Sequence, residues 1–305
     1  MVVAIVVTYF PDHATLYLLL GRLRMQAQHV VVVDNGSGSE FKKYIESIEN
    51  ADALGNVTFI FLNENIGIAA AQNQGIEWAK EHRASDVVLF DQDSIPSIDL
   101  VRNLVDAKQI LIAQGLKVAA VGSRYIDIRR DNPPPFIRIE GLRLVRCKCD
   151  ESNGIVPVEY LISSGCLIPM NVINDVGGME NRLFIDYVDI EWGLRAKVKG
   201  YQSYGSCLAQ MNHSLGDEPI NFIGMKIPLH SPLRHFYHFR NAVWLYRQPW
   251  VKVNWKIVDG YKLFLKYIFY TIFAKPRLLH LKMMSLGIWH GLTNKLGKYD
   301  GKTTA

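Results

Sequence analysis

Residues 86–93 read DVVLFDQD, an apolar run that stops at two carboxylates, Asp91 and Asp93, separated by Gln92. The continuous apolar character of this run is typical of a strand buried on both faces. Strands of this kind occur in parallel sheets, which bind ligands at the carboxyl ends of their strands. The position of the two acids therefore predicts a parallel α/β fold with a site at the end of this strand.

The chain before this strand alternates between strand and helix patterns. Strands are predicted over residues 2–7, 30–33 and 57–62, and helices over 14–25, 41–48 and 68–80. This alternation indicates a parallel sheet with right-handed crossover connections. Polar residues follow the earlier strands as well, at Thr8, Asp34 and Asn63. We therefore expect a Rossmann-like, mostly parallel sheet flanked by helices, with these side chains along one edge.

The rest of the chain is less regular. A helix is predicted over residues 100–114, a strand over 118–122, short meandering strands over 136–162, a helix over 191–199 and a helical region from 233 onward. A length of 305 residues suits one large α/β domain with an appendage, which we place at residues 1–229 and 230–305. Four cysteines are too few for a disulfide scaffold, so we expect a reducing cytosol.

Asp91 and Asp93 are candidates for binding a divalent cation. Carboxylate oxygens suit Mg²⁺ or Mn²⁺, which keep coordination positions open for substrate phosphates. In the alternative interpretation Asp93 caps a turn and Asp91 is a solvated loop acid, but the strand-end position favours the metal site. His213 is a candidate third ligand, although a lone histidine is more often structural.

Two loops are candidates for binding a nucleotide. Asp34 can accept a hydrogen bond from a base or a ribose, or it can close a turn with the glycine-rich loop that follows, and local features favour neither role. Asn65 and Gly67 precede a helix whose first turns carry small residues and Asn73. Such a helix N-terminus favours an anion, while tight helix–sheet packing would need the same small residues.

Asp186, Asp189 and Glu191 place three acids within six positions, before and at the start of a predicted helix. One carboxylate in such a cluster can remove the proton of an acceptor hydroxyl, and Asp189 is our candidate for that base. The alternative for Asp189 and Glu191 is helix capping. Arg195 follows Glu191 by four residues, which predicts a structural ion pair for Glu191.

Taken in order, these segments resemble a family 2 glycosyltransferase of the GT-A fold, in the bacterial rhamnosyltransferase branch. The resemblance covers about residues 2–245. It rests on residues 7–10, 33–37, 63–67, 72–75 and 90–94, and further on Ser164-Gly165, residues 184–195, His213 and Arg240-Asn241. The individual motifs are loose, but their order and spacing are specific.

The resemblance implies roles for individual residues. It implies donor nucleotide contacts at Thr8, Tyr9, Phe10, Asp34, Asn65, Gly67, Asn73, Asp91 and Gln92, metal binding at Asp93, His213 and Asp91, and acceptor or phosphate contacts at Ser164, Gly165, Asp186, Glu191, Trp192 and Arg240. Asp189 would be the general base of an inverting transfer. The donor would be a dTDP-sugar, dTDP-L-rhamnose above all. Phe10 stands where many relatives carry Asn, which puts a side-chain contact there in doubt.

The end of the chain is basic and aromatic. Residues 230–305 hold thirteen Lys or Arg against two acids. An apolar stretch over 263–273 is too short to span a bilayer but suits a helix lying in the membrane interface. We expect a bacterial protein peripheral to the inner face of the cell membrane, with a glycan acceptor that is free or lipid-linked, and no nucleic-acid partner. A core or homodimer helix is the alternative for this stretch.

Two other functions would fit part of the pattern. A nucleotidyltransferase also uses paired aspartates and Mg²⁺, but residues 8–14 contain no glycine-rich, basic triphosphate loop. A catalytically silent subunit could instead scaffold a membrane polysaccharide-assembly complex through the basic tail. Transfer of a sugar onto a growing cell-surface polysaccharide, such as an O antigen, remains the function that the sequence favours.

Overall fold

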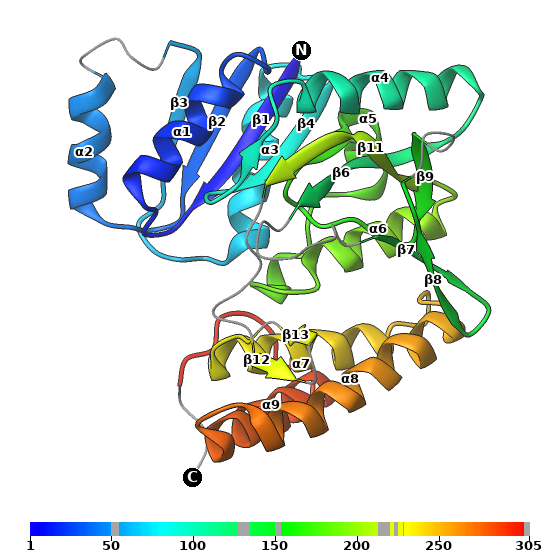
Figure 1. Ribbon diagram of the computed structural model, residues 1–305. Helices are drawn as coiled ribbons and strands as arrows, with labels where there is room; N and C mark the ends of the chain where they lie inside the picture. Colours follow the sequence, from blue (N-terminus) through cyan, green and yellow to red (C-terminus); the bar gives the residue numbers. More distant parts are fainter. Residues whose placement is uncertain are drawn as a thin grey trace.

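The computed structural model describes residues 1–49, 55–126, 135–149, 154–212, 220–222, 225–227 and 229–301. The first half alternates strands and helices, as predicted (Figure 1). Its elements are β1 Val2–Thr8, α1 His13–Leu23, β2 His29–Asp34, α2 Ser39–Glu49, β3 Val57–Phe61, α3 Ile68–Glu81, β4 Asp86–Asp91, β5 Ile95–Pro96, α4 Leu100–Ala113 and β6 Val118–Ile126.

The second half begins with strands and ends with helices. Its elements are β7 Phe136–Glu140, β8 Arg143–Cys147, β9 Ile155–Val158, β10 Cys166–Pro169, α5 Met170–Val176, the 3₁₀ turn Asn181–Leu183, α6 Val188–Val198, β11 Gln202–Asn212, β12 Ile220–Phe222, β13 Met225–Ile227, α7 Pro232–Tyr246, α8 Val253–Phe273 and α9 Arg277–Leu292. The predicted helical region after residue 233 is confirmed.

One large sheet forms the centre of the molecule, in the order β3-β2-β1-β4-β10-β6-β11-β5. The first four strands of this order are parallel, whereas β10 runs antiparallel to both of its neighbours. The predicted mostly parallel α/β class is therefore confirmed. Strands β10 and β11 of this sheet were not predicted. The mixed polar and apolar residues of β11 show neither a buried-strand run nor a clean alternation, and the four residues of β10 are too few to show a period.

The alternation of side chains along the strands divides the core in two. Val3, Ile5 and Val7 of β1 face one side of the sheet, where they join a cluster with residues of α3, α5 and α6. Ala4 and Val6 face the other side and pack with residues of α1, α2 and α4. Because both faces are covered, the strands read as continuous apolar runs, which is what made them recognisable in the sequence.

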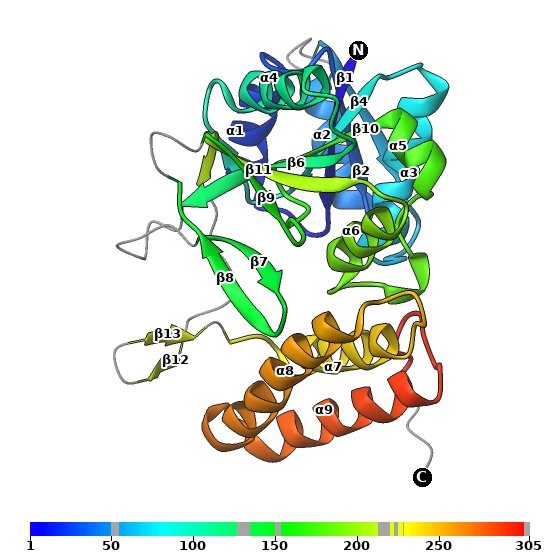
Figure 2. The ribbon, with the colours of Figure 1, turned by 90° about the vertical axis from the view of Figure 1, so that its right-hand side faces the viewer.

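Helices α7, α8 and α9 form a separate layer beyond α6, at the end of the molecule away from the N-terminus (Figures 1 and 2). Residues of α7 and α8 nevertheless belong to the same buried cluster as the sheet. No helix in the part of the chain that the structure describes is long and apolar enough to cross a membrane. The boundary between residues 229 and 230 stays a prediction.

Candidate functional site

The predicted polar residues come together at the carboxyl edge of the parallel strands. Thr8 is the register partner of Asp34 across β1 and β2, and Val7 is the partner of Asp91 across β1 and β4. This arrangement follows from the parallel pairing, because all strands of such a set end at the same edge. Thr8, Asp34 and Asp91 therefore occupy one continuous edge, as the sequence analysis expected.

Asp34 is almost completely buried and holds two loops in place. Its carboxylate accepts hydrogen bonds from the Thr8 hydroxyl at 3.1 Å and from the Ser37 backbone N–H at 2.9 Å. The Ser37 hydroxyl oxygen in turn accepts from the backbone N–H of Phe10 at 2.8 Å. The structure thus shows the turn-closing role of Asp34, and its contact with a base stays a prediction.

The loop after β2 and the loop after β3 are bonded to each other. The Asn35 side chain donates to Asn65 at 3.1 Å and accepts from the Ile66 N–H at 2.9 Å. Gly36, at φ 89°, lies so close to the neighbouring loop that a Cβ would meet the backbone of Glu64 at 2.6 Å. The two predicted nucleotide loops are therefore bonded into one unit. They can lie this close together only because position 36 is glycine.

The β4 end is bonded to the loops around it. The Gln92 amide exchanges hydrogen bonds with the backbone of Tyr9, at 2.7 and 3.3 Å. The Ser164 hydroxyl accepts from the Asp91 N–H at 3.1 Å and lies 2.5 Å from the Ser94 hydroxyl. Gly165 follows in a left-handed conformation, at φ 71°. These bonds fix the backbone of the Asp91–Asp93 turn, while the Asp93 side chain is exposed.

The predicted acceptor-side acids Asp186 and Asp189 lie just before α6 and in its first turn. Asp189 is desolvated, and this burial, together with the nearby charges of Asp186 and Asp91, raises its pKa to about 6. Asp189 also lines a cavity with Leu89 of β4 and Ser163, so the start of α6 lies beside the end of β4. A carboxylate whose pKa lies just below neutral pH suits a general base. Asp186 lies beside Arg234, at 3.4 Å.

Four other predicted contact residues have structural partners. Glu191 is buried and paired with Arg195 at 2.8 Å, as its spacing predicted. The buried Trp192 indole donates to the Gly177 carbonyl at 2.9 Å, and Asn73 bonds both the N–H and the C=O of Met179. The guanidinium of Arg240, which is 1% exposed, donates to backbone carbonyls. Ligand contacts for these residues stay predictions.

Residues 4–148 match the family model described as glycosyl transferase family 2. The chain is also 35% identical over 247 residues to the dTDP-rhamnosyl transferase RfbF of Shigella flexneri, a match that covers 80% of this chain and 79% of that protein. The chain belongs to glycosyl transferase family 2. This membership confirms the family to which the sequence motifs pointed, and the two alternative functions lose support.

Solved structures share the fold of this glycosyltransferase. A structure of GalNAc-T7 with UDP, GalNAc and Mn²⁺ superposes with a TM-score of 0.56 at 13% identity, covering 90% of this chain and 57% of that one. The mannosyltransferase PcManGT from Pyrobaculum calidifontis, in complex with GDP-Man and Mn²⁺, gives a TM-score of 0.56 at 17% identity, covering 96% and 75%. The predicted GT-A fold is confirmed.

The predicted metal ligands of the glycosyltransferase are placed only in part. His213 lies outside the described residues, and within them no group of three or more His, Cys, Asp or Glu side chains is arranged to hold a metal ion. Asp91 and Asp93 supply hard oxygen donors at the strand edge. Such a pair fits Mg²⁺ or Mn²⁺, because these ions complete their coordination with water and substrate phosphates.

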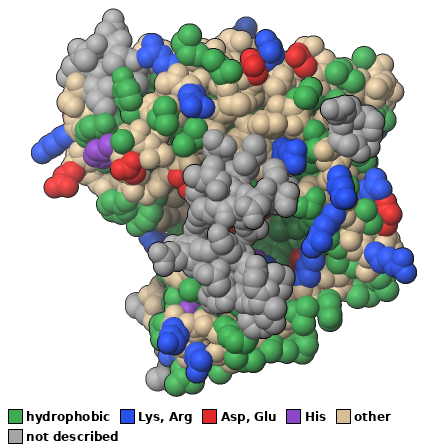
Figure 3. All heavy atoms as spheres, viewed as in Figure 1, with side chains coloured by type: hydrophobic (Ala, Val, Ile, Leu, Met, Phe, Trp, Pro, Cys, Tyr) green, Lys and Arg blue, Asp and Glu red, His purple; other side chains and the backbone are tan. Residues whose placement is uncertain are grey.

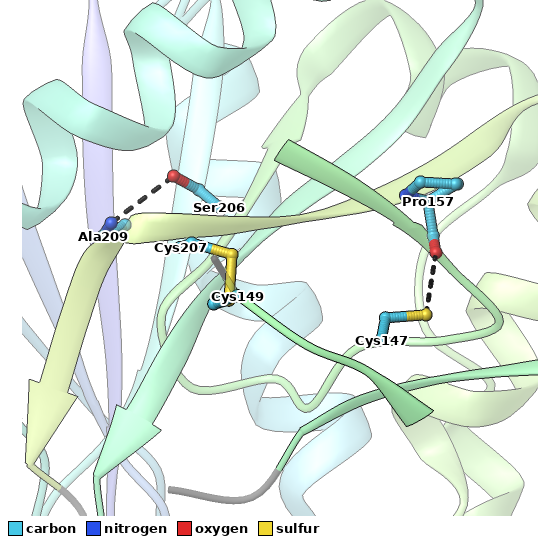
Figure 4. The surroundings of a disulfide bond; sticks show 6 residues. All are labelled: Cys147, Cys149, Pro157, Ser206, Cys207 and Ala209. Atoms are coloured by element: carbon cyan, nitrogen blue, oxygen red, sulfur yellow. Dashed lines mark hydrogen bonds between the residues drawn. A yellow bond between two sulfur atoms is a disulfide. The ribbon is translucent and has the colours of Figure 1, made fainter. Parts of the chain in front are cut away.

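The sequence analysis of the glycosyltransferase missed one cross-link. Cys149, just after β8, and Cys207, in β11, form a disulfide with a Cα–Cα distance of 5.5 Å (Figure 4). Cys147 is not part of it and lies 3.8 Å from the Pro157 carbonyl oxygen, measured from its Sγ. The two bonded cysteines are 58 residues apart, so no spacing rule could have paired them.

Proposed function

We propose that this glycosyltransferase moves L-rhamnose from dTDP-L-rhamnose to a hydroxyl of a growing cell-surface glycan, in one inverting displacement. The observation that carries the acceptor half is Asp189, which lines one cavity with Leu89 of β4 and Ser163 and whose pKa is raised to about 6, as suits a general base. The identity of the donor rests on the match to the Shigella flexneri dTDP-rhamnosyl transferase.

The transfer is one substitution at the anomeric carbon. Asp189 takes the proton of the acceptor hydroxyl while that oxygen forms a bond to the anomeric carbon. The bond from this carbon to the diphosphate breaks on the opposite face, and the electron pair leaves with dTDP, which inverts the configuration. Asp93, Asp91 and His213 would hold Mg²⁺ or Mn²⁺, which offsets the negative charge of the leaving diphosphate when bound.

The donor nucleotide is proposed to lie along the strand edge described above. The rings of Tyr9 and Phe10 are exposed, and their centroids lie 4.7 Å apart. Together they offer an apolar surface for the base. Asn65 and Gly67, just before α3, are proposed to line the same edge, where Asn65 is held by the Asn35 side chain. Thr8 and Asp34 would then act by holding the loop that carries these rings.

A panel of sugar nucleotides tests this proposal. Purified protein is mixed with dTDP-rhamnose, dTDP-glucose, UDP-glucose or GDP-mannose, with Mn²⁺ or with chelator, and thermal shift and released nucleoside diphosphate are measured. We expect stabilisation by the dTDP compounds, turnover with dTDP-rhamnose, and loss of both with chelator, because ligands of the folded state raise its melting temperature. Turnover of UDP- or GDP-sugars alone would refute the donor assignment.

We further propose that the protein binds the anionic membrane surface through α8. Exposed apolar side chains recur along one face of this helix at spacings of three or four residues, and we call them the α8 stripe: Val253, Ile257, Tyr261, Phe264, Ile268 and Ile272. Hydrophobic atoms line the lower edge of the molecule, where α8 and α9 lie (Figure 3). An apolar helix face in a basic region is typical of interfacial binding.

A lipid-linked acceptor would suit this location. A cavity of about 460 Å³ lies between α7 and α8, with apolar walls that include Leu265 and Phe269 and with Lys266 and His238 among its lining. Leu265 is also exposed beside the α8 stripe. An amphipathic acceptor could therefore extend from the membrane surface along α8 toward Asp186, which pairs with Arg234 of α7.

Vesicle binding tests the membrane contact. Cosedimentation with phosphatidylglycerol vesicles is compared with phosphatidylcholine vesicles, for wild type and for a Phe264→Asp/Ile268→Asp variant. The matched control is Ile110→Asp/Ile112→Asp on α4, where both side chains are about as exposed. We expect only the α8 variant to lose binding to anionic vesicles. Unchanged vesicle binding, with a dimer that the α8 variant converts to a monomer, would instead assign the stripe to a homodimer.

A further inference from the structure

The loop from Leu183 to Tyr187 leads from the 3₁₀ turn into α6, just before the candidate base. Three of its residues have positive φ angles without being glycine: Phe184 at 67°, Asp186 at 63° and Tyr187 at 64°. Bulky residues rarely adopt this conformation, and it persists only where the surroundings hold it. The contacts of this loop therefore decide where Asp186 and Asp189 lie.

Asn241 of α7 supplies one set of these contacts. Its side chain is fully buried, and its amide nitrogen donates to the carbonyls of Leu183 at 2.9 Å, Ile185 at 2.7 Å and Asp186 at 2.8 Å. The two N–H donors of this amide are therefore shared among three carbonyls of the strained loop, which requires one bifurcated bond. A side chain without N–H donors at position 241 would take these hydrogen bonds away from the buried loop carbonyls.

Arg240 reinforces the same arrangement. Its guanidinium donates to the Leu183 carbonyl at 2.7 Å and to the Gly297 carbonyl at 2.5 Å, and its Nε donates to the Asn241 side-chain oxygen at 2.9 Å. The last bond orients the Asn241 amide so that its nitrogen faces the loop. Arg240 therefore ties together the loop, Asn241 and the segment after α9.

The donor side holds the loop from the opposite direction. The Ile68 N–H at the start of α3 donates to the Phe184 carbonyl at 2.7 Å. A Cβ on Gly67 would meet the Phe184 ring and backbone at 2.7 Å, so the ring fills the space that glycine leaves. On its other side the Phe184 ring stacks with Tyr237 of α7 at 5.0 Å. The loop is clamped between the donor-side motif and α7.

We propose that Arg240 and Asn241 are positioning residues, which hold the strained loop so that Asp186 and Asp189 face the donor edge. In this role the C-terminal helices complete the acceptor half of the site, beyond any contact with membrane. The inference rests on the proposed function for its catalytic meaning, since it assumes that Asp189 acts as the base. It differs from the acceptor or phosphate contact that the family resemblance implied for Arg240.

Asn241→Ala tests the proposal against Asn294→Ala as the matched control. Asn294 accepts a hydrogen bond from the Trp244 indole of α7 at 3.0 Å, so its truncation also removes a contact of the C-terminal helices but none to the loop. We expect kcat to fall about 100-fold in Asn241→Ala, since a displacement near 1 Å has that effect. The KM for the donor and the thermal shift with dTDP should stay within about twofold of wild type. The control should keep kcat within about threefold of the wild-type value.

Hydrogen–deuterium exchange gives a readout that does not depend on turnover. Amides of residues 183–190 should exchange faster in Asn241→Ala and not in Asn294→Ala, because only the first releases the loop carbonyls. Equal kcat and equal exchange in the two variants would overturn the proposal. Arg240→Lys replaces Asn241→Ala if the latter does not fold. Kinetics use whichever donor the panel shows to be active, and the exchange result stands even if dTDP-rhamnose is not that donor.

Discussion

Two regions of this glycosyltransferase are built in different ways. One is the donor edge, formed by the ends of β1, β2 and β4, and the other is the acceptor loop, Leu183 to Tyr187. The donor edge consists of turns that follow parallel strands, and its bonds join neighbouring strand ends, as between Thr8 and Asp34. The acceptor loop has three strained non-glycine residues and is held by side chains more than fifty positions away, such as Asn241. One half follows from the sheet itself, whereas the other depends on how distant helices pack.

This difference suggests that the two halves fail in different ways. Changes at the donor edge should weaken binding of the nucleotide, because the proposed nucleotide contacts lie on that edge. Changes around the acceptor loop should lower the rate of transfer and leave the nucleotide bound, because they displace only the base. The three substitutions below test this separation, beginning with the largest expected effect.

Asp189→Asn should lower kcat by about 10³-fold and leave dTDP binding unchanged, because it removes only the base. In wild type, kcat should rise with pH and level off above the Asp189 pKa of about 6, and the variant should lack this limb. Steady-state kinetics from pH 5 to 8 with dTDP titrations measure both. A variant with normal kcat would exclude Asp189 as base.

The same substitution has a predicted effect on stability. The Asp189 pKa is raised in the folded state, so the folded protein binds more protons than the unfolded chain and loses stability as pH rises from about 4 to about 6. Asp189→Asn removes this loss and should be more stable than wild type at pH 7.5 by up to about 3 kcal/mol, with little difference near pH 4. Urea unfolding at both pH values measures this.

Asp93→Asn should lower kcat/KM by about 10²- to 10³-fold and also weaken the thermal shift with dTDP and Mn²⁺. The reason is that it removes a proposed ligand of the metal that would bind the diphosphate. Asp99→Asn, a nearby acid at the start of α4, is the control and should behave as wild type. If Asp93→Asn binds the donor as tightly as wild type, and chelator does not weaken that binding, then donor binding does not require the metal.

Gly67→Ala should have the smallest effect on the rate of transfer, and it should disturb both the donor edge and the acceptor loop. The added Cβ meets Phe184 at 2.7 Å, and the φ of 91° disfavours alanine. We expect a loss of about 1–3 kcal/mol in unfolding free energy. We also expect about a tenfold loss of kcat, since the acceptor loop must shift away from the donor motif. Gly38→Ala, also at positive φ but with open space around it, is the control. A shift in dTDP binding without a change in kcat would contradict the clamp.

The sequence by itself determined the four parallel strands β1 to β4 and the edge at which they end. Continuous apolar runs such as Val2 to Val7 identify strands covered on both faces, and polar residues at their ends mark the edge where parallel strands finish. The ion pair of Glu191 with Arg195 was equally predictable, because four-residue spacing on a helix fixes the contact.

Only the tertiary structure decided how the acceptor half is held. The clamp by Arg240 and Asn241 and the cross-link of Cys149 to Cys207 join residues about 58 positions apart, and neither periodicity nor motif spacing encodes such distances. The positive φ angles of the loop could not be predicted from its residue types either, because Phe184 and Tyr187 disfavour that conformation on their own. Local preference specifies strands and helices, and long-range packing overrides it at the loop that carries the acids.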